Sequence, residues 1–219
     1  AAQGCRVFVA YCLPKDDSAT AGDTTVGGPA RYRAMQSQSG EPVARGIRER
    51  GGAAAAGEFD LQDAANVDRV LDTCESELGP ADILINNHTH CVEETFDPAA
   101  AGDGMALISG PEIDRHMTIN ARGTALMMAE YLRRHIARGA DWGRIINMTT
   151  TLQHARNVSY AASKGAIVSY TLSAASEMGR YGITVNVVGP GPTQTGYITP
   201  ELETQLAADT PLGRVGRPD

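Results

Sequence analysis

Short apolar runs alternate along the chain with longer stretches in which apolar residues recur every three or four positions. The short runs are typical of buried β-strands, and the longer stretches are typical of amphipathic helices. Strands are predicted at 6–11, 53–59, 82–86, 144–148 and 183–188. Helices are predicted at 43–50, 63–78, 111–138, 158–180 and 200–208. This alternation indicates βαβ units and a parallel sheet.

Two segments interrupt the alternation. Residues 13–41 are rich in Gly, Ser, Thr, Asp and Pro, and residues 92–110 form a second long connection. We expect irregular structure in both. The remaining elements need right-handed crossovers and helices on both faces of the sheet. The sequence therefore predicts a single α/β domain over residues 1–219, with a doubly wound parallel sheet in a three-layer α/β/α sandwich.

Composition narrows the possible functions. The net charge of −7 and the pI near 5.2 argue against a nucleic-acid-binding protein, which needs a basic face. No apolar run reaches the roughly 18 residues that span a bilayer, and the first residues do not resemble a signal peptide. The four cysteines are scattered and are expected to be reduced thiols. We expect a cytoplasmic protein without nucleic-acid or membrane partners.

The strongest chemical signal is the pair Tyr160 and Lys164. Residues four apart on a helix share one face, so the ammonium lies near the phenol. A nearby positive charge lowers the pKa of a tyrosine, which can then exchange a proton with a carbonyl or alcohol oxygen. A Tyr-x-x-x-Lys spacing is common by chance, but Lys164 is one of only two lysines in the chain.

Further polar residues follow the predicted strands, where such sheets bind ligands. The hydroxyls of 149–151 could hold a substrate oxygen, or could simply bond the local backbone. Asn86 follows a strand, and Asn120 stands inside a helix, where asparagine is mildly unfavourable. The turn 189–195 lets backbone approach a ligand. The segment 88–91 (HTHC) carries possible zinc ligands, but no further His/Cys cluster accompanies it, so no metal site is predicted.

In this order and spacing, the motifs resemble one family. Asp60-Leu61, Asn86-Asn87, Asn120, RIINMTT, YAASK, ITVNVVGPGPTQTG and PLGRVGRPD resemble the short-chain dehydrogenase/reductases, and within them the 3-oxoacyl-[acyl-carrier-protein] reductase-like branch. The resemblance implies a Rossmann-like fold. It also implies an enzyme that moves a hydride between NAD(P) and a carbonyl or alcohol, with a 3-oxoacyl thioester as one candidate substrate.

The resemblance also assigns roles to individual residues. Tyr160 is the general acid/base, Lys164 lowers its pKa and binds the nicotinamide ribose, and Asn120 supports a proton relay. The position of the family's catalytic serine falls on Thr150, with Thr149 and Thr151 as alternatives. Cofactor contacts are expected from Asp60, Leu61, Asn86, Tyr160, Lys164, Pro190, Gly191, Thr193 and Thr195.

The chain departs from the family pattern at both ends. The N-terminal strand with its TGxxxGxG turn and the last helix and strand have no counterpart here, so the resemblance implies a chain trimmed at both ends. Lys15, Arg31 and Arg33 follow the first strand and favour NADP, with NAD possible. A homodimer or homotetramer is expected. The alternative to an enzyme is a catalytically silent relative, or a fragment, that serves as a binding or assembly module.

Overall fold

The computed structural model describes residues 1–14, 23–102, 105–150 and 156–218. The chain divides into two compact units. The central unit is Phe59–Gly189, and the terminal unit combines Ala1–Glu58 with Pro190–Asp219. Each unit is an α/β arrangement with parallel strands, so the predicted class is confirmed. The prediction of a single domain stays a prediction.

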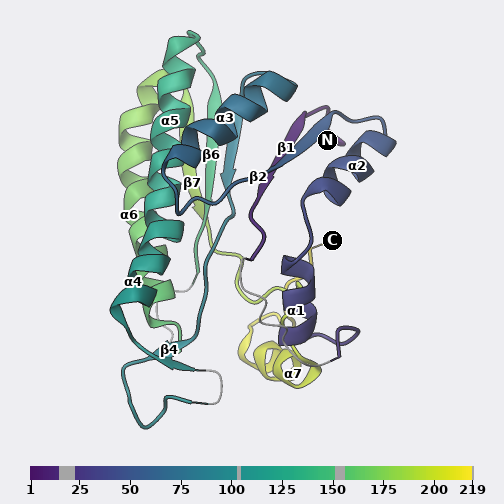
Figure 1. Ribbon diagram of the computed structural model, residues 1–219, viewed down its shortest axis with the longest axis vertical. Coiled ribbons are helices and arrows are strands. Elements are labelled where there is room, and N and C mark those ends of the chain that lie inside the picture. Colours follow the sequence, from purple (N-terminus) through teal and green to yellow (C-terminus); the bar gives the residue numbers. More distant parts are fainter. Residues whose placement is uncertain (15–22, 103–104, 151–155, 219) are drawn as a thin grey trace. The chain divides into compact units, whose positions relative to one another are not determined.

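The central unit is built on a three-stranded parallel sheet. Its order is β3 (Ile83–Asn86), β6 (Gly143–Met148), β7 (Ile183–Val188). Alternate residues of β6 are buried, as expected for a strand whose apolar side chains point into a core. Helices α3 (Ala65–Leu78), α5 (Gly123–Ala137) and α6 (Val158–Met178) belong to this unit, and α5 and α6 lie side by side against the sheet in Figure 1.

The predicted helix over 111–138 is one continuous helical segment with a change of winding. It runs as α4 (Gly110–His116), a π-helical turn η1 (Met117–Arg122) and α5. The preceding connection is less irregular than expected, because β4 (Glu94–Thr95) and β5 (Ala106–Leu107) form a short parallel pair. After α6, a 3₁₀ turn η2 (Gly179–Tyr181) leads to Gly182, whose φ of +73° begins the approach to β7.

The terminal unit contains a two-stranded parallel sheet. β1 (Val7–Tyr11) pairs with β2 (Ala54–Glu58) from Val7↔Ala54 to Tyr11↔Glu58, and α2 (Glu41–Glu49) packs on both strands. Residues 13–41 were predicted to be irregular, but they contain α1 (Pro29–Gln36). Pro29 occupies the first turn of this helix, where a missing N–H costs nothing. The mixed polarity of α1 gives no clear helical period in the sequence, so this helix was not predicted.

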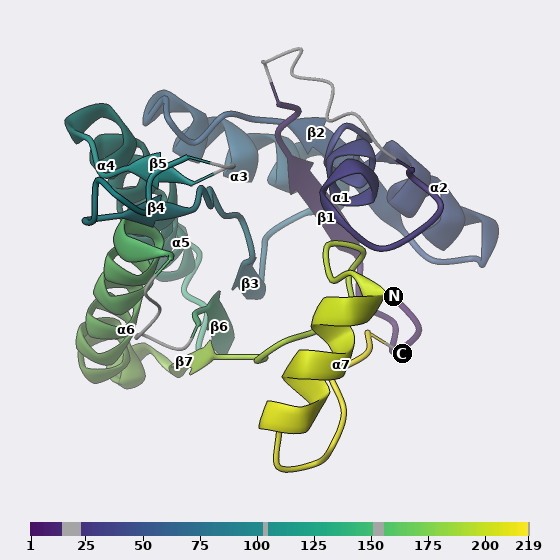
Figure 2. The same ribbon diagram turned by 90° about the horizontal axis from the view of Figure 1, so that it is seen from below.

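The rest of the terminal unit is the C-terminal segment, shown from a second side in Figure 2. The side chain of Thr199 caps α7 (Pro200–Asp209) by accepting from the Leu202 N–H at 3.2 Å. Tyr32 and Tyr197 meet edge to face, with ring centroids 5.8 Å apart. Across the described residues of both units, we find no helix with the length and apolar character needed to cross a bilayer.

Candidate active site

Tyr160 and Lys164 lie one turn apart on α6, and the lysine is almost fully buried. Only 3% of Lys164 is exposed. Its Nζ donates to the Met148 carbonyl at 3.1 Å, at the end of β6, and lies 5.6 Å from the centre of the Tyr160 ring. The end of a strand and one turn of a helix thus hold the ammonium beside the phenol, as the spacing in the sequence predicted.

Burial makes the Lys164 ammonium unusually acidic. Loss of solvent lowers its pKa to about 8, and the neighbouring thiol of Cys91 opposes this shift. The lysine therefore carries its charge at neutral pH and loses it at mildly alkaline pH. The pKa of His88 is also lowered, to about 4, mainly by burial and in addition by the charge of Lys164. His88 is neutral at pH 7.

The threonines after β6 differ in what their hydroxyls do. The Thr149 N–H donates to the Val188 carbonyl at 2.9 Å, and its Oγ1 donates to the Lys164 carbonyl at 3.3 Å. Thr149 therefore ties β6 to β7 and α6. Thr150 is half-buried one residue further on. Thr151, the other alternative for the serine role, lies outside the described residues.

Asn120 is fully buried at the centre of a hydrogen-bonded network. Its Oδ1 accepts from the His90 N–H at 2.7 Å, and its Nδ2 donates to the His90 carbonyl at 2.9 Å and to Ser163 Oγ at 2.9 Å. Ser163 Oγ in turn donates to the Tyr160 carbonyl at 2.7 Å. Asn120 is thereby linked to α6 between Tyr160 and Lys164. Its position in the π-helical turn fits the frequent use of such turns at functional sites.

Ser163 is a residue of this network that the sequence reasoning missed. A small hydroxyl residue beside Lys164, on a helix rich in small residues, is a weak signal. It becomes informative only when Asn120 is seen to donate to it.

Asn86, predicted to lie along the cofactor, has its side chain in the core. Its Nδ2 donates to Asn147 Oδ1 at 2.8 Å, and its cofactor contact stays a prediction. Asn147 Nδ2 donates to Thr171 Oγ1 at 2.9 Å, and Thr171 Oγ1 donates to the Ile167 carbonyl at 2.7 Å. The amide of Asn86 therefore joins β3 to β6 and α6. Asn147, a polar residue within an apolar strand, was the available signal for this network.

Asp60 and Leu61, predicted near the adenine, stand at the start of the central unit. Asp60 Oδ1 accepts from the Gln62 N–H at 3.0 Å, and its backbone carbonyl accepts from Asn66 Nδ2 at 2.8 Å. Leu61 lies against Gly123, where an added Cβ would sit 3.5 Å from the Leu61 Cβ and 3.2 Å from His88 Nε2. The lack of a side chain at Gly123 lets both residues approach α5 closely.

The predicted contacts Pro190, Gly191, Thr193 and Thr195 belong to the terminal unit. Gly191 has a φ of +69°, which favours glycine, and Thr193 Oγ1 donates to its carbonyl at 3.3 Å. Thr193 also bridges to Gly216, and the Thr195 N–H donates to the Thr193 carbonyl at 2.9 Å. Local hydrogen bonds thus give this segment a defined turn.

The central unit can be tested for its fit to a nicotinamide cofactor. An ammonium has three N–H donors, and among the described residues Lys164 Nζ donates to one acceptor, the Met148 carbonyl. A buried cation with unused donors, one helical turn from a phenol, matches the paired hydroxyls of a ribose. The residues present therefore fit such a group.

Comparison with known proteins gives a consistent result. The family model described as short chain dehydrogenase matches residues 27–206. The chain is 35% identical to the uncharacterized oxidoreductase YjdA of Bacillus subtilis over 164 residues, which cover 74% of this chain and 62% of that protein. It is 33% identical to galactitol 2-dehydrogenase of Agrobacterium fabrum, over 77% of this chain and 69% of that one. The chain therefore spans less than two thirds of the Bacillus relative.

A solved structure shares the fold. The gluconate 5-dehydrogenase of Burkholderia cenocepacia, in complex with NADP and tartrate, superposes with a TM-score of 0.70 at 26% identity. The match covers 97% of this chain and 83% of the Burkholderia protein. The Rossmann-like α/β fold that the sequence predicted is thus confirmed by an independent structure.

Proposed function

The chain belongs to the short-chain dehydrogenase family, and on that premise we propose that it is an NAD(P)-dependent oxidoreductase that interconverts a carbonyl and an alcohol. The observation that carries the proposal is the buried Lys164 ammonium, 5.6 Å from the centre of the Tyr160 ring. A cation at that position favours the phenolate over the phenol. Tyr160 can then give a proton to a carbonyl oxygen, or accept one from an alcohol, near neutral pH.

The neighbouring residues would orient the reacting groups. Thr150 Oγ1 is the proposed donor to the substrate oxygen, because the Thr149 hydroxyl already donates to the Lys164 carbonyl. Both Nδ2 protons of Asn120 are used by His90 and Ser163. Asn120 therefore acts through its backbone carbonyl in the π-helical turn, where it can hold a water that returns protons to Lys164.

The proposed cofactor contacts follow the resemblance to the family. Lys164 and Tyr160 would bind the nicotinamide ribose, Asp60 and Leu61 the adenine, and the segment 190–195 the carboxamide and phosphates. When bound, the nicotinamide ring supplies or accepts the hydride. NADP is the proposed form, because Arg31 and Arg33 on α1 offer positive charge for a ribose phosphate.

The substrate is proposed to be a small carbonyl or secondary alcohol. The galactitol and gluconate dehydrogenases among the similar proteins favour a polyol or sugar acid. A 3-oxoacyl thioester is the second candidate, supported by the resemblance of the motifs to the 3-oxoacyl reductases. A silent relative has less support, because Tyr160, Lys164 and Asn120 are all present and joined through α6.

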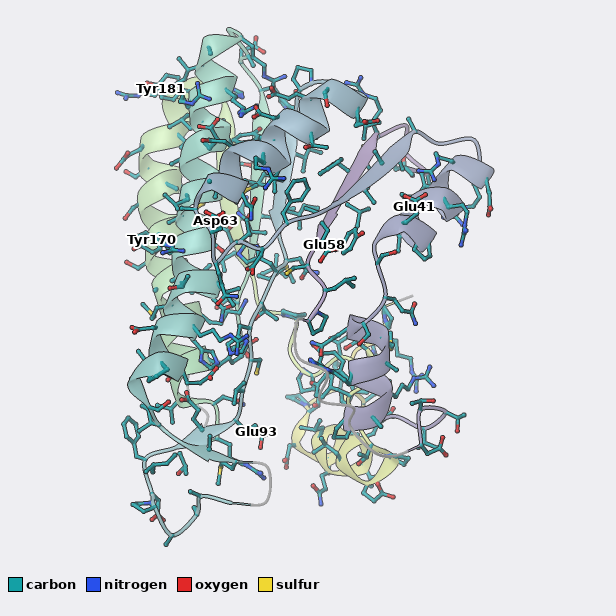
Figure 3. The ribbon with its side chains drawn as sticks, in the orientation of Figure 1. Glu41, Glu58, Asp63, Glu93, Tyr170 and Tyr181 are labelled. Carbon is teal, nitrogen blue, oxygen red and sulfur yellow. The ribbon has the colours of Figure 1, made fainter. Side chains whose placement is uncertain are left out.

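A paired substitution on α6 tests the function. Tyr160→Phe removes the proton donor, and Tyr170→Phe removes a hydroxyl from an exposed position of the same helix, labelled in Figure 3. We expect NADPH to bind both variants, by fluorescence titration, and turnover of a panel of polyols, sugar acids and 3-oxoacyl thioesters to fall at least about 10²-fold in Tyr160→Phe alone. Turnover that survives Tyr160→Phe would contradict the proposed role.

The oligomeric state is a further expectation. Helices α5 and α6 expose large apolar side chains, among them Leu126, Ile136 and Leu172. Such a surface is suited to packing against a second copy of the chain. We expect a homodimer or homotetramer by light scattering, and a monomer would contradict this.

A further inference from the structure

A second cluster of polar side chains lies in the central unit, apart from the tyrosine–lysine pair. His90 Nε2 contacts Glu112 Oε1, and His116 lies one turn after Glu112 on α4. One potential ligand atom from each of His90, Glu112 and His116 falls within 4.8 Å of the others. The rings of His90 and His116 are 4.6 Å apart, centre to centre.

A fourth side chain, Glu94 on β4, lies beside His116 at the edge of this cluster. Glu94 is 0% exposed, and its Oε2 lies 4.0 Å from His116 Nδ1, which is also 3.8 Å from Glu112 Oε1. Ligands of a tetrahedral zinc ion stand about 3.3 Å apart, because the metal–ligand bonds measure about 2.0–2.2 Å. The ligand atoms of His90, Glu112 and His116 lie within 4.8 Å of one another, so each pair would need to approach by at most about 1.5 Å to reach that spacing.

The carboxylate of Glu94 is buried and only partly satisfied by hydrogen bonds. Its Oε2 accepts from the Ser159 N–H at 3.2 Å, but its Oε1 is buried and makes no hydrogen bond with any described residue. A buried carboxylate with an unpartnered oxygen is costly unless a proton or a cation satisfies it. In the described part of the chain, the only ion-pair partner within 4.0 Å of Glu94 is the ring of His116.

Metal binding would require one rearrangement. His116 Nδ1 now donates to the Glu112 carbonyl at 2.8 Å, and its Nε2 accepts from the Val92 N–H at 3.3 Å. A metal on Nδ1 would replace the hydrogen bond to the Glu112 carbonyl and move the ring proton to Nε2, so the bond from Val92 would be lost as well. His116 would thus exchange two hydrogen bonds for one bond to the metal.

We propose that His90, Glu112 and His116, with Glu94 beside them, form a binding site for a divalent transition metal of the zinc class. Imidazole nitrogens and carboxylate oxygens are suited to this class. The ligands come from α4, β4 and the segment after β3, so the ion would fasten the connection 88–95 to the helix. The same connection bonds Asn120 through the backbone of His90, and metal binding would therefore stiffen the support of that residue.

The test uses the full chain with metal alone and requires neither cofactor nor substrate. Chelator-treated protein is titrated with Zn²⁺ by calorimetry and with Co²⁺ by visible absorption. We expect one ion per chain and the intense visible bands of tetrahedral Co²⁺ without thiolate charge transfer. Absence of stoichiometric binding in the wild-type chain, or a thiolate band, would overturn the proposal.

Variants locate the ion. His90→Gln and Glu112→Gln change partly exposed side chains, so both are expected to fold, as checked by circular dichroism. Each should weaken Co²⁺ binding at least tenfold. Glu93→Gln is the matched control: Glu93 neighbours Glu94, is labelled in Figure 3, and pairs instead with Arg156 at 2.9 Å. Undiminished binding in His90→Gln and Glu112→Gln, or an equal loss in Glu93→Gln, would place the ion elsewhere and refute the site.

Discussion

The two units differ most in what fills their cores. In the central unit, branched and aromatic side chains are almost fully buried, including Ile145, Ile167, Ile183 and Tyr131. In the terminal unit, the cluster on the two-stranded sheet consists of Ala44, Ile47 and Ala54, with Val7 and Ala56 against it. Alanine buries little area, and a two-stranded sheet is marginal without further support.

This difference separates two demands on the protein. Proton transfer needs groups held at fixed positions, and Tyr160, Lys164 and Asn120 all belong to the well-packed central unit. The segment 190–195, proposed to contact the cofactor, belongs to the unit with the smaller core. Stability should therefore be distributed unevenly along the chain. The first of four predictions tests this difference between the units, and the other three concern single groups of the central unit.

The largest effect is expected from a pair of core truncations. Ile145→Ala removes a side chain that is 0% exposed and should lower the free energy of unfolding by about 3–4 kcal/mol. Ile47→Ala, in the smaller core, should cost about 1–2 kcal/mol and raise hydrogen exchange only in the terminal unit. Urea unfolding and residue-level exchange measure both, and equal global losses would remove the distinction between the units.

The buried amide network should be the next most sensitive feature. Asn147→Ala removes one hydrogen-bond partner from the Asn86 amide and one from the Thr171 hydroxyl. We therefore expect the free energy of unfolding to fall by about 2–3 kcal/mol. Asn186→Ala on β7 is the control, because Asn186 is exposed. If thermal melting shifts equally in both variants, the network does not stabilise the central unit.

Lys164→Met should separate function from stability. The buried ammonium is held at a pKa of about 8, below its ordinary value, so the unfolded chain binds the proton more strongly than the folded chain. Wild-type stability should consequently rise as the pH increases from about 8 to 10.5, and Lys164→Met at pH 7 should gain roughly 2 kcal/mol while losing activity. A variant that is less stable at pH 7 would contradict this.

His88 should give the smallest effect. Its folded pKa of about 4 lies below the ordinary value of 6.5, so the unfolded chain takes up a proton first as the pH falls. As the pH falls from 6.5 to 5.5, the free energy of unfolding of the wild type should fall by about 1 kcal/mol more than that of His88→Gln. Chemical unfolding of both proteins at the two pH values provides the comparison.

The sequence predicted the elements better than the contacts. Periodicity located the five predicted strands and the helices from α2 onward, because burial imposes a regular pattern on each element. It missed α1, whose apolar residues are too few to show a period, and the β4–β5 pair, which is two residues long on each side. Short elements leave too little pattern to detect.

At the candidate site, too, contacts within a single element were the predictable ones. Tyr160 and Lys164 share a helix, so their spacing alone indicated the pair. The hydrogen bond between the Asn86 and Asn147 amides was not predicted, because the two residues lie on different strands, 61 positions apart. The cluster at His90, Glu112 and His116 likewise joins segments that are 22 to 26 positions apart, counted from His90. The local spacing of residues in the sequence does not reveal contacts between positions so far apart.

Because of the π-helical turn at Met117–Arg122, the number of residues in this segment determines how α4 is rotated relative to α5. A π turn holds one residue more than an α turn, so deleting a single residue within it would restore uniform winding. Such a deletion would leave α5 in place and rotate everything before the turn by about 100°. His116 and Glu112 would then face a new direction while the buried face of α5 stayed unchanged. One inserted or deleted residue in the turn would therefore change the direction in which the side chains of α4 point, without changing how α5 packs.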